Sequence, residues 1–331
     1  MAWLSGYTTR RKLTIDQTKV DDNLADFPVL VKLTSANFDF TKANADGFDL
    51  RFTSSDGETL LKYERERHDS VNELAEYWVK VPAVAAGADT DIYIYYRTTD
   101  TADGADPTNV WDSNYKMVLH MNDNPDTSTV QDSTSNNKDG TKKAANEPIE
   151  AVGKIGKAQD FDGSDDRIDT TPAATSAHTI TAWIYPHNVY STGEGHLFSL
   201  ADTDYFAVRN TKLNSYTYQS DNVYANTVLA VNNWYHVTLV RNGTAYAFYL
   251  NGAPDGTPTA ASRAIAGTHG VGARGTTGAY PFDGIIDEFR LSEGVRSAAW
   301  IKADYNSGAD TLLTYGDEEV PPAGGSHGFI F

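Results

Sequence analysis

Residues 234–252 read Trp-Tyr-His-Val-Thr-Leu-Val-Arg-Asn-Gly-Thr-Ala-Tyr-Ala-Phe-Tyr-Leu-Asn-Gly, and this stretch decides the fold. Asn242-Gly243 separates two runs rich in aromatic and β-branched residues, a pattern that favours a β-hairpin with a two-residue type I′ turn. With that turn, three apolar pairs share one face: Leu239 with Tyr246, Val237 with Phe248 and Tyr235 with Leu250. We therefore expect this face to lie in a hydrophobic core.

The opposite face of the hairpin mixes polar and apolar side chains. It alternates Trp234, His236 and Thr238 on one run with Ala247 and Tyr249 on the other. Such a face can be wetted, so we consider it a candidate recognition surface. For His236 we expect a structural hydrogen bond and no catalytic role.

Composition sets the broad class of the protein. The chain has 331 residues, enough for two domains, and 40% hydrophobic residues, enough for real cores. No apolar run approaches the length of a membrane span, so we expect no membrane insertion. The N-terminal residues lack the pattern of a signal peptide. We expect a protein that acts where it is made, leaves the cell by lysis or inside a particle, or was trimmed.

Charge and cysteine content exclude several functions. Forty-five acidic against 27 basic residues give a formal net charge of −18, which repels a phosphate backbone. Nucleic acid is therefore not an expected partner. The acidic excess is typical of a solvated surface, with cation binding by some carboxylates as the alternative. The absence of cysteine excludes disulfides and thiolate chemistry but identifies no compartment.

The first third of the chain shows an all-β pattern. Short strands separated by turn-forming residues are expected at 12–15, 27–33, 49–52, 77–81 and 91–96. In the last of these, apolar and tyrosine side chains fill both faces, so Tyr93 and Tyr95 are interpreted as packing residues. Residues 97–114 are polar, lack periodicity and contain Pro107, so they form a connector with a domain boundary near Val110.

This first region resembles DUF2341, a bacterial and phage domain of unknown function. The matching segments are Phe27-Pro-Val-Leu-Val-Lys-Leu33, Phe48-Asp-Leu-Arg-Phe-Thr-Ser-Ser-Asp-Gly57, Tyr77-Trp-Val-Lys-Val-Pro82 and Ile92-Tyr-Ile-Tyr-Tyr96. The resemblance implies a β-sandwich that commonly precedes lectin-like domains. It supplies no catalytic residue.

A second resemblance covers about Tyr115 to Glu318. It is carried by a strand from Tyr115, the segments 158–169, 179–185 and 282–291, and the opening hairpin, which occur in the order of the laminin-G-like, concanavalin A-like lectin and glucanase superfamily. The implied fold class is all-β, with two antiparallel β-sandwich domains at 1–110 and 111–318, the second a concanavalin A-like jelly roll. This fold hosts lectins, enzymes and spacer domains alike.

The C-terminal part adds one helix and a tail. Residues 297–305 favour a short helix with Ser297 as N-cap. Residues 319–331 form a tail rich in Pro and Gly that ends in Phe329, Ile330 and Phe331. Such tails are commonly flexible, and the alternative is that the three apolar residues dock into a neighbouring subunit.

Motifs for catalysis are missing from the sequence. Glucanases of this fold carry two carboxylates on one strand face, whereas the adjacent Asp287 and Glu288 point to opposite faces. A nucleophile elbow, a zinc-binding His-Glu-x-x-His and a phosphate-binding glycine loop are also absent. We expect a protein that is not an enzyme.

Calcium is the one cofactor that the sequence suggests. In relatives of the superfamily, Asp132 and Asp287 lie at motifs that look like a structural calcium position, and carboxylates with loop carbonyls are suitable ligands. The alternative is that Asp132 caps a turn and Asp287 forms an ion pair, for example with Arg290. The run Asp160–Asp166 does not match EF-hand spacing and is interpreted as an exposed hairpin turn.

Aromatic residues in polar loops are the candidates for sugar recognition, because a ring can stack on the apolar face of a pyranose. Tyr190, Tyr224 and Tyr280 lie in such loops, and the alternative for each is a plain protein contact. Trp183 and Trp234 lie in strands and are expected to pack.

These patterns together predict a non-enzymatic binding or structural protein of a phage virion, as a tail-fibre, receptor-binding or head-decoration component. Its expected partners are other virion proteins or identical subunits and a host-surface glycan. The alternatives are a bacterial cell-surface adhesin or carbohydrate-binding fragment, and a tail protein that degrades polysaccharide.

Overall fold

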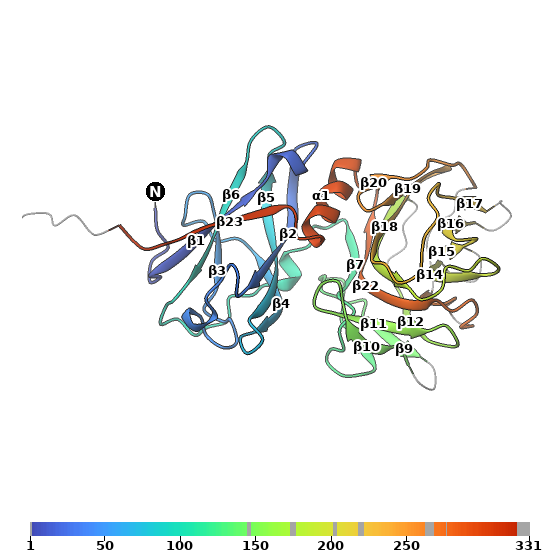
Figure 1. Cartoon of the computed structure of the whole chain (residues 1–331), viewed down its shortest axis with the longest axis horizontal. Helices are drawn as coiled ribbons and strands as arrows, with labels where there is room; N and C mark the ends of the chain where they lie inside the picture. The colour runs from blue at the N-terminus through green and yellow to red at the C-terminus, as the bar shows by residue number, and fades with distance from the viewer. Residues whose placement is uncertain are drawn as a thin grey trace, which may run out of the picture. The chain divides into compact units, whose positions relative to one another are not determined.

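A computed structural model describes residues 2–143, 147–172, 177–200, 204–217, 222–261, 268–275 and 277–322. The chain divides into two compact units, Met1–Val110 with Ala309–Phe331, and Trp111–Gly308. Antiparallel sheets dominate both units, which confirms the all-β prediction (Figure 1). In the described part of the chain, no helix has both the length and the apolarity needed to cross a bilayer.

The first unit is a sandwich of a four-stranded and a three-stranded sheet. Phe52 of the first sheet contacts Tyr63 and Tyr77 of the second, with ring centroids 5.1 and 5.5 Å apart, so the core lies between the sheets. In spatial order the strands are β23 (Leu313–Glu319), β1 (Thr9–Ile15), β6 (Thr90–Tyr96) and β3 (Arg51–Ser54), then β2 (Leu24–Thr34), β5 (Leu74–Val84) and β4 (Tyr63–Asp69). Three 3-10 helices connect them, η1 (Gln17–Lys19), η2 (Phe40–Lys42) and η3 (Pro107–Asn109).

Strand β6 is buried on both faces, as its pattern predicted. Tyr93 and Tyr95 are at most 2% exposed, although they point away from the sandwich core. The Arg10 guanidinium lies 4.0 Å from the ring centroid of Tyr93, and its Nη1 donates a 2.8 Å hydrogen bond to the Tyr95 hydroxyl. The interpretation of both tyrosines as packing residues is confirmed.

The last strand of the chain belongs to the first unit, and here the structure differs from the sequence-based boundaries. The sequence predicts residues 313–318 in the second domain and residue 319 in a tail, but β23 pairs with β1 along its length, with Leu13 opposite Tyr315. Glu319 and Glu318 form ion pairs with Arg10 and Lys42. This pairing joins residues about 300 positions apart, which local periodicity does not reveal.

The second unit is a larger sandwich with two eight-stranded sheets in its described part. Their facing sides form one continuous apolar core. The first sheet runs β10 (Ile149–Val152), β11 (Lys157–Asp162), β22 (Asp283–Glu293), β13 (Ala177–Pro186), β18 (Tyr235–Asn242), β19 (Ala245–Leu250) and β20 (Ala253–Pro254), and β7 (Tyr115–Leu119) also pairs with β22. The second runs β17 (Val223–Tyr224), β16 (Lys212–Tyr216), β15 (Asp204–Arg209), β14 (Glu194–Leu200), β21 (His269–Val271), β12 (Arg167–Thr170), β9 (Gly140–Lys143) and β8 (Thr129–Val130).

Strands β18 and β19 form the expected hairpin with a different turn. Asn242 pairs with Ala245, so the turn residues are Gly243 and Thr244 and the predicted type I′ turn is wrong. Gly243 takes a φ of +59°, as the first turn residue of a type II′ turn requires. The pairing slides by two residues, which preserves the pleat, so the predicted core face is confirmed.

Helix α1 (Ala298–Gly308) packs against part of the opposite face of the hairpin, where the ring centroids of Tyr305 and His236 lie 6.0 Å apart. Ala247 and Tyr249 on the same face are only half-buried, so a recognition surface there stays a prediction. His236 is 2% exposed, and its Nε2 lies 3.2 Å from Asp304 Oδ2, which confirms a structural hydrogen bond. Asp304 also accepts a 2.8 Å hydrogen bond from Arg290. The predicted N-cap is confirmed, since the Trp300 amide donates to Ser297 Oγ at 3.2 Å.

Candidate functional site

The outer face of β14–β17 gathers most of the polar and aromatic side chains that could hold a ligand. The strands alternate, with Phe206, Val208 and Leu213 in the core and their neighbours outside. A bulge after His196 puts Leu197 and Phe198 both into the core, which leaves Glu194 and His196 on the outer face. Cross-strand register then places two rows on this face: His196, Ala207, Asn214 and Tyr224, and Glu194, Arg209 and Lys212.

Four rings form a stack on this face. His196 stacks on Tyr205 with centroids 4.1 Å apart, and Tyr205 stacks on Tyr216 at 5.3 Å. Tyr280, from the loop before β22, stacks on the other side of His196 at 5.1 Å. His196 is fully buried, whereas Tyr280 is 43% exposed. The stack therefore holds the Tyr280 ring in a defined orientation at the surface.

Glu194 binds the polar edges of this stack. It accepts a 2.9 Å hydrogen bond from the Tyr205 hydroxyl and another from Arg209 Nη1, and His196 Nε2 lies 3.4 Å from its Oε1. Burial opposes ionisation of Glu194, but these three partners outweigh it and bring its pKa down to about 2. Burial also lowers the pKa of His196, so the imidazole is neutral at neutral pH.

Two cations on this face have no ion-pair partner in the described part of the chain, Arg274 and Lys212. The guanidinium carbon of Arg274 lies 4.7 Å from the ring centroid of Tyr280. Arg209, by contrast, is neutralised by Glu194. Among the described residues of this face, Arg274 and Lys212 therefore contribute positive charge on a chain with a net charge of −18.

The three tyrosines predicted from loop composition have different surroundings. Tyr280 presents its ring at the surface. Tyr224 lies at the far end of the first row, and its hydroxyl accepts a 3.2 Å hydrogen bond from Asn210. The Tyr190 hydroxyl donates to Pro281 O at 2.8 Å and accepts from Asp283 N at 2.7 Å. Tyr190 thus anchors the loop that carries Tyr280.

Sequence reasoning missed His196, Tyr205, Arg209 and Arg274. The sequence contained one signal for this face, the strand period of two. That period places Glu194 and His196 on one face of a strand, and likewise Tyr205 and Arg209. Arg274 had none, because its contact with Tyr280 depends on the loop conformation.

Asp132 of the predicted calcium pair is held by protein donors. Its two carboxylate oxygens accept hydrogen bonds of 2.8 to 3.0 Å from the amides of Val118, Thr134 and Lys138 and from the Thr134 hydroxyl. Burial raises the pKa of this carboxyl. The geometry is that of a turn cap.

Asp287, the other predicted ligand, is fully buried in β22. Its Oδ2 accepts a 2.9 Å hydrogen bond from the Ile155 amide. Burial and the neighbouring Glu288 carboxylate raise its pKa well above the usual value. Within the second unit, the described cluster of three potential cation ligands is formed by other residues, Asp162, Asp165 and Asp166. Phe329, Ile330 and Phe331 lie outside the described residues.

Glu288, the neighbour of Asp287, takes a positive φ of +50° next to a register shift in β22. It pairs with His120 Nδ1 at 2.6 Å and with Arg290. These pairings make Glu288 part of a buried ionic chain. The absence of catalysis stays a prediction.

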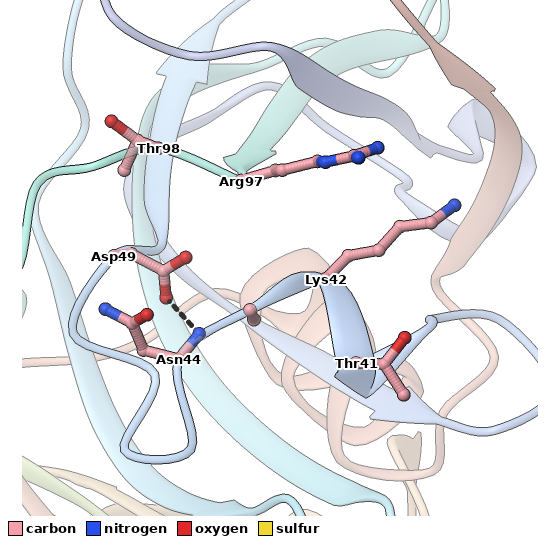
Figure 2. A pocket seen from close by; sticks show the side chains of 7 residues that line it. Thr41, Lys42, Asn44, Asp49, Arg97 and Thr98 are labelled. Carbon is pink, nitrogen blue, oxygen red and sulfur yellow. Dashed lines mark hydrogen bonds between the residues drawn. The ribbon is translucent and has the colours of Figure 1, made fainter.

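The first unit contains a separate, open hollow with a volume of about 380 Å³ (Figure 2). It is lined by Thr41, Lys42, Ala43, Asn44, Asp49, Arg97 and Thr98. At its base, Asp49 accepts a 2.9 Å hydrogen bond from the Asn44 amide, and burial raises the pKa of this carboxyl. The Lys42 ammonium is paired with Glu318. No aromatic ring lines this hollow, so it lacks the stacking platform of the second unit.

Two family models match the chain in the order that the motifs indicated. Residues 46–137 match a domain of unknown function, DUF2341, and residues 162–302 match the concanavalin A-like lectin/glucanases superfamily. The chain therefore contains a DUF2341 domain followed by a lectin-like, concanavalin A-like β-sandwich domain. Comparison with curated proteins yields no significant match.

Several solved structures resemble about 60% of this chain. Domain 4 of AbnA, a GH43 extracellular arabinanase from Geobacillus stearothermophilus in complex with arabinotriose, is 21% identical with a TM-score of 0.46, over 60% of this chain and 98% of that one. The binding domain of Paraclostridial Mosquitocidal Protein 1 is 14% identical with a TM-score of 0.48, over 59% and 52%. The receptor binding domain of botulinum neurotoxin type G is 13% identical with a TM-score of 0.46, over 59% and 51%. Similarity at this level carries no functional conclusion, and the match spans about half the length of the two toxin domains.

Proposed function

We propose that this chain is a non-enzymatic glycan-binding protein whose lectin-like unit holds a sugar on the outer face of β14–β17. One observation carries the proposal: the exposed Tyr280 ring is fixed by stacking on His196 and lies beside the guanidinium of Arg274. An aromatic ring offers an apolar platform for the C–H face of a pyranose, and a guanidinium donates to hydroxyls or carboxylates.

The fixed geometry favours binding because little side-chain freedom is lost when a ligand arrives. Stacking against buried His196 holds Tyr280, and the Tyr190 hydroxyl ties down the loop that carries it. Arg274 has no ion-pair partner in the described part of the chain, so it can turn from the ring toward a ligand.

The charged side chains of the proposed site indicate which glycans it should prefer. Arg274 and Lys212 have no ion-pair partner among the described residues, whereas Arg209 is balanced by Glu194. Complementary charge favours a ligand with a carboxylate. We infer that the preferred glycan contains an acidic sugar, such as a uronic acid.

As the setting, we propose a phage virion, with the chain as a tail-fibre, receptor-binding or head-decoration component that contacts identical subunits or other virion proteins. The order of a DUF2341 domain before a lectin-like domain supports an extracellular particle or surface. Mass spectrometry of purified virions tests this setting. Absence of the chain from the particles would favour the bacterial-surface alternative.

A glycan array that includes neutral and acidic oligosaccharides tests the binding function. We expect hits that contain acidic sugars, and at least a tenfold weaker affinity for Tyr280→Ala and Arg274→Ala. Tyr249→Ala is the matched control, because Tyr249 is a half-buried tyrosine on β19 of the other sheet. An array without hits, or equal affinity for the wild type and Tyr280→Ala, contradicts the proposal.

A further inference from the structure

The connection between β11 and β12 brings three carboxylates together. Asp162 ends β11, and Asp165 and Asp166 directly precede β12. One oxygen from each of the three lies within 4.8 Å of the others. Asp283 of β22 faces Asp162 across the strand pair, which adds a fourth carboxylate beside the cluster.

Among the described residues, no cationic side chain forms an ion pair with these three carboxylates, Asp162, Asp165 and Asp166. The basic group at the edge of the cluster is His187, whose Nδ1 lies 3.7 Å from Asp160 and 3.5 Å from Asp283. Carboxylates packed this closely repel one another unless a cation lies between them.

Asp166 provides an independent sign of a missing ligand. The residue is 2% exposed, and its Oδ2 accepts a 2.9 Å hydrogen bond from the Asp162 amide. Its Oδ1 is buried and receives no hydrogen bond from the residues that the structure describes. Asp132, another buried aspartate of this unit, receives four. A buried carboxylate oxygen without a donor is costly, and a bound ion removes that cost.

A cavity of about 180 Å³ adjoins Asp166 and gives space for an ion with its waters. It is lined by Glu147, Ile149, Asp160, Phe161, Asp162, Asp166 and His187. Carboxylate oxygens and water are the ligands of hard divalent cations. Calcium accepts an irregular set of six to eight oxygens, whereas magnesium requires near-ideal octahedral geometry.

We propose that Asp162, Asp165 and Asp166 bind a calcium ion that ties the end of β11 to the start of β12. The orphaned oxygen of Asp166 and the clustered ligands support this position, and the cavity adjoins two of the three, Asp162 and Asp166. The site differs from the Asp132 and Asp287 pair suggested by the sequence, and it lies on a segment interpreted there as a plain exposed turn. It does not depend on the glycan proposal.

Calorimetric titration of the full, EDTA-treated chain with CaCl₂ tests the proposal. We expect saturable binding of one ion, and at least a tenfold higher dissociation constant for Asp165→Asn and Asp166→Asn. Asp126→Asn is the matched control, because Asp126 also lies in an exposed turn and accepts a hydrogen bond from the amide two residues on, as Asp162 does. The control should bind calcium as the wild type does.

Thermal unfolding gives a second readout, because the difference in unfolding temperature between the wild type and Asp166→Asn should change when calcium is added. Without calcium, Asp166→Asn should unfold at the same or a higher temperature than the wild type, because it removes a buried charge. With saturating CaCl₂ the wild type should become the more stable of the two. If Asp166→Asn does not fold, Asp165→Asn is the decisive variant, because Asp165 is exposed. Lack of saturable binding by the wild type, or unchanged affinity in Asp165→Asn, overturns the proposal.

Discussion

Glu194 gives the sharpest prediction for the ring stack, because its ionised form holds three partners. We consider Glu194→Gln, which keeps the shape of the side chain and removes its charge. In the folded chain the pKa of Glu194 is about 2, against about 4.5 when unfolded. At roughly 1.4 kcal/mol per pKa unit the full shift corresponds to about 3.5 kcal/mol. Since Arg209 is one-third exposed, solvent screening reduces the expected contribution to about 1–2 kcal/mol.

The sign of the pH dependence follows from the lowered pKa. Ionised Glu194 stabilises the fold above pH 4.5, and this contribution is lost as the pH falls from about 4.5 toward 2. Glu194→Gln should therefore be less stable than the wild type at pH 7, and the difference should shrink toward pH 3. Urea unfolding at pH 7, 5, 4 and 3 measures it. The two proteins share all other carboxylates, so the pH dependence of those groups cancels in the difference between their free energies of unfolding. A difference that does not change with pH would refute the role assigned to Glu194.

Two further predictions concern buried titratable groups of the second unit. Burial, with Arg241 and His269 nearby, lowers the pKa of His178 to about 3, so the unfolded chain binds a proton that the folded chain does not. The free energy of unfolding should fall as the pH drops from about 6.5 toward 3. In urea unfolding, His178→Leu should show a smaller change over this pH range. A pH dependence equal to that of the wild type contradicts the prediction. Asp304→Ala removes a 2.8 Å partner of buried Arg290 and the partner of His236, so we expect a loss of about 3 kcal/mol. Calorimetric unfolding measures this loss, and a variant as stable as the wild type contradicts the prediction.

The opening hairpin shows which features of the fold were predictable. Its apolar face followed from the strand period of two, and a two-residue error in the turn left that face unchanged. The partial cover on its other face was not predictable, because helix α1 lies some fifty residues further along the chain. Close approach by the helix is visible at Gly252, where an added Cβ would lie 2.9 Å from Tyr305 Cβ.

The candidate site was predictable only where local sequence was enough. Tyr280 was found because it lies in a polar loop. The roles of His196 and Tyr205 depend on a bulge and on cross-strand register, neither of which is marked in the sequence. The acidic turn was visible as a run of aspartates, but the orphaned oxygen of Asp166 exists only in the folded chain.

The sequence by itself determined the all-β class and the core face of the hairpin, because side-chain alternation acts over a few residues. The order of the two domain types followed from motifs that resemble two known families. The tertiary structure alone decided that β23 returns to the first unit, that rings from separate strands and a loop form one stack, and that the carboxylates of three aspartates lie close together. These features depend on which distant segments pair and in what register, and that outcome is set by packing of the whole chain.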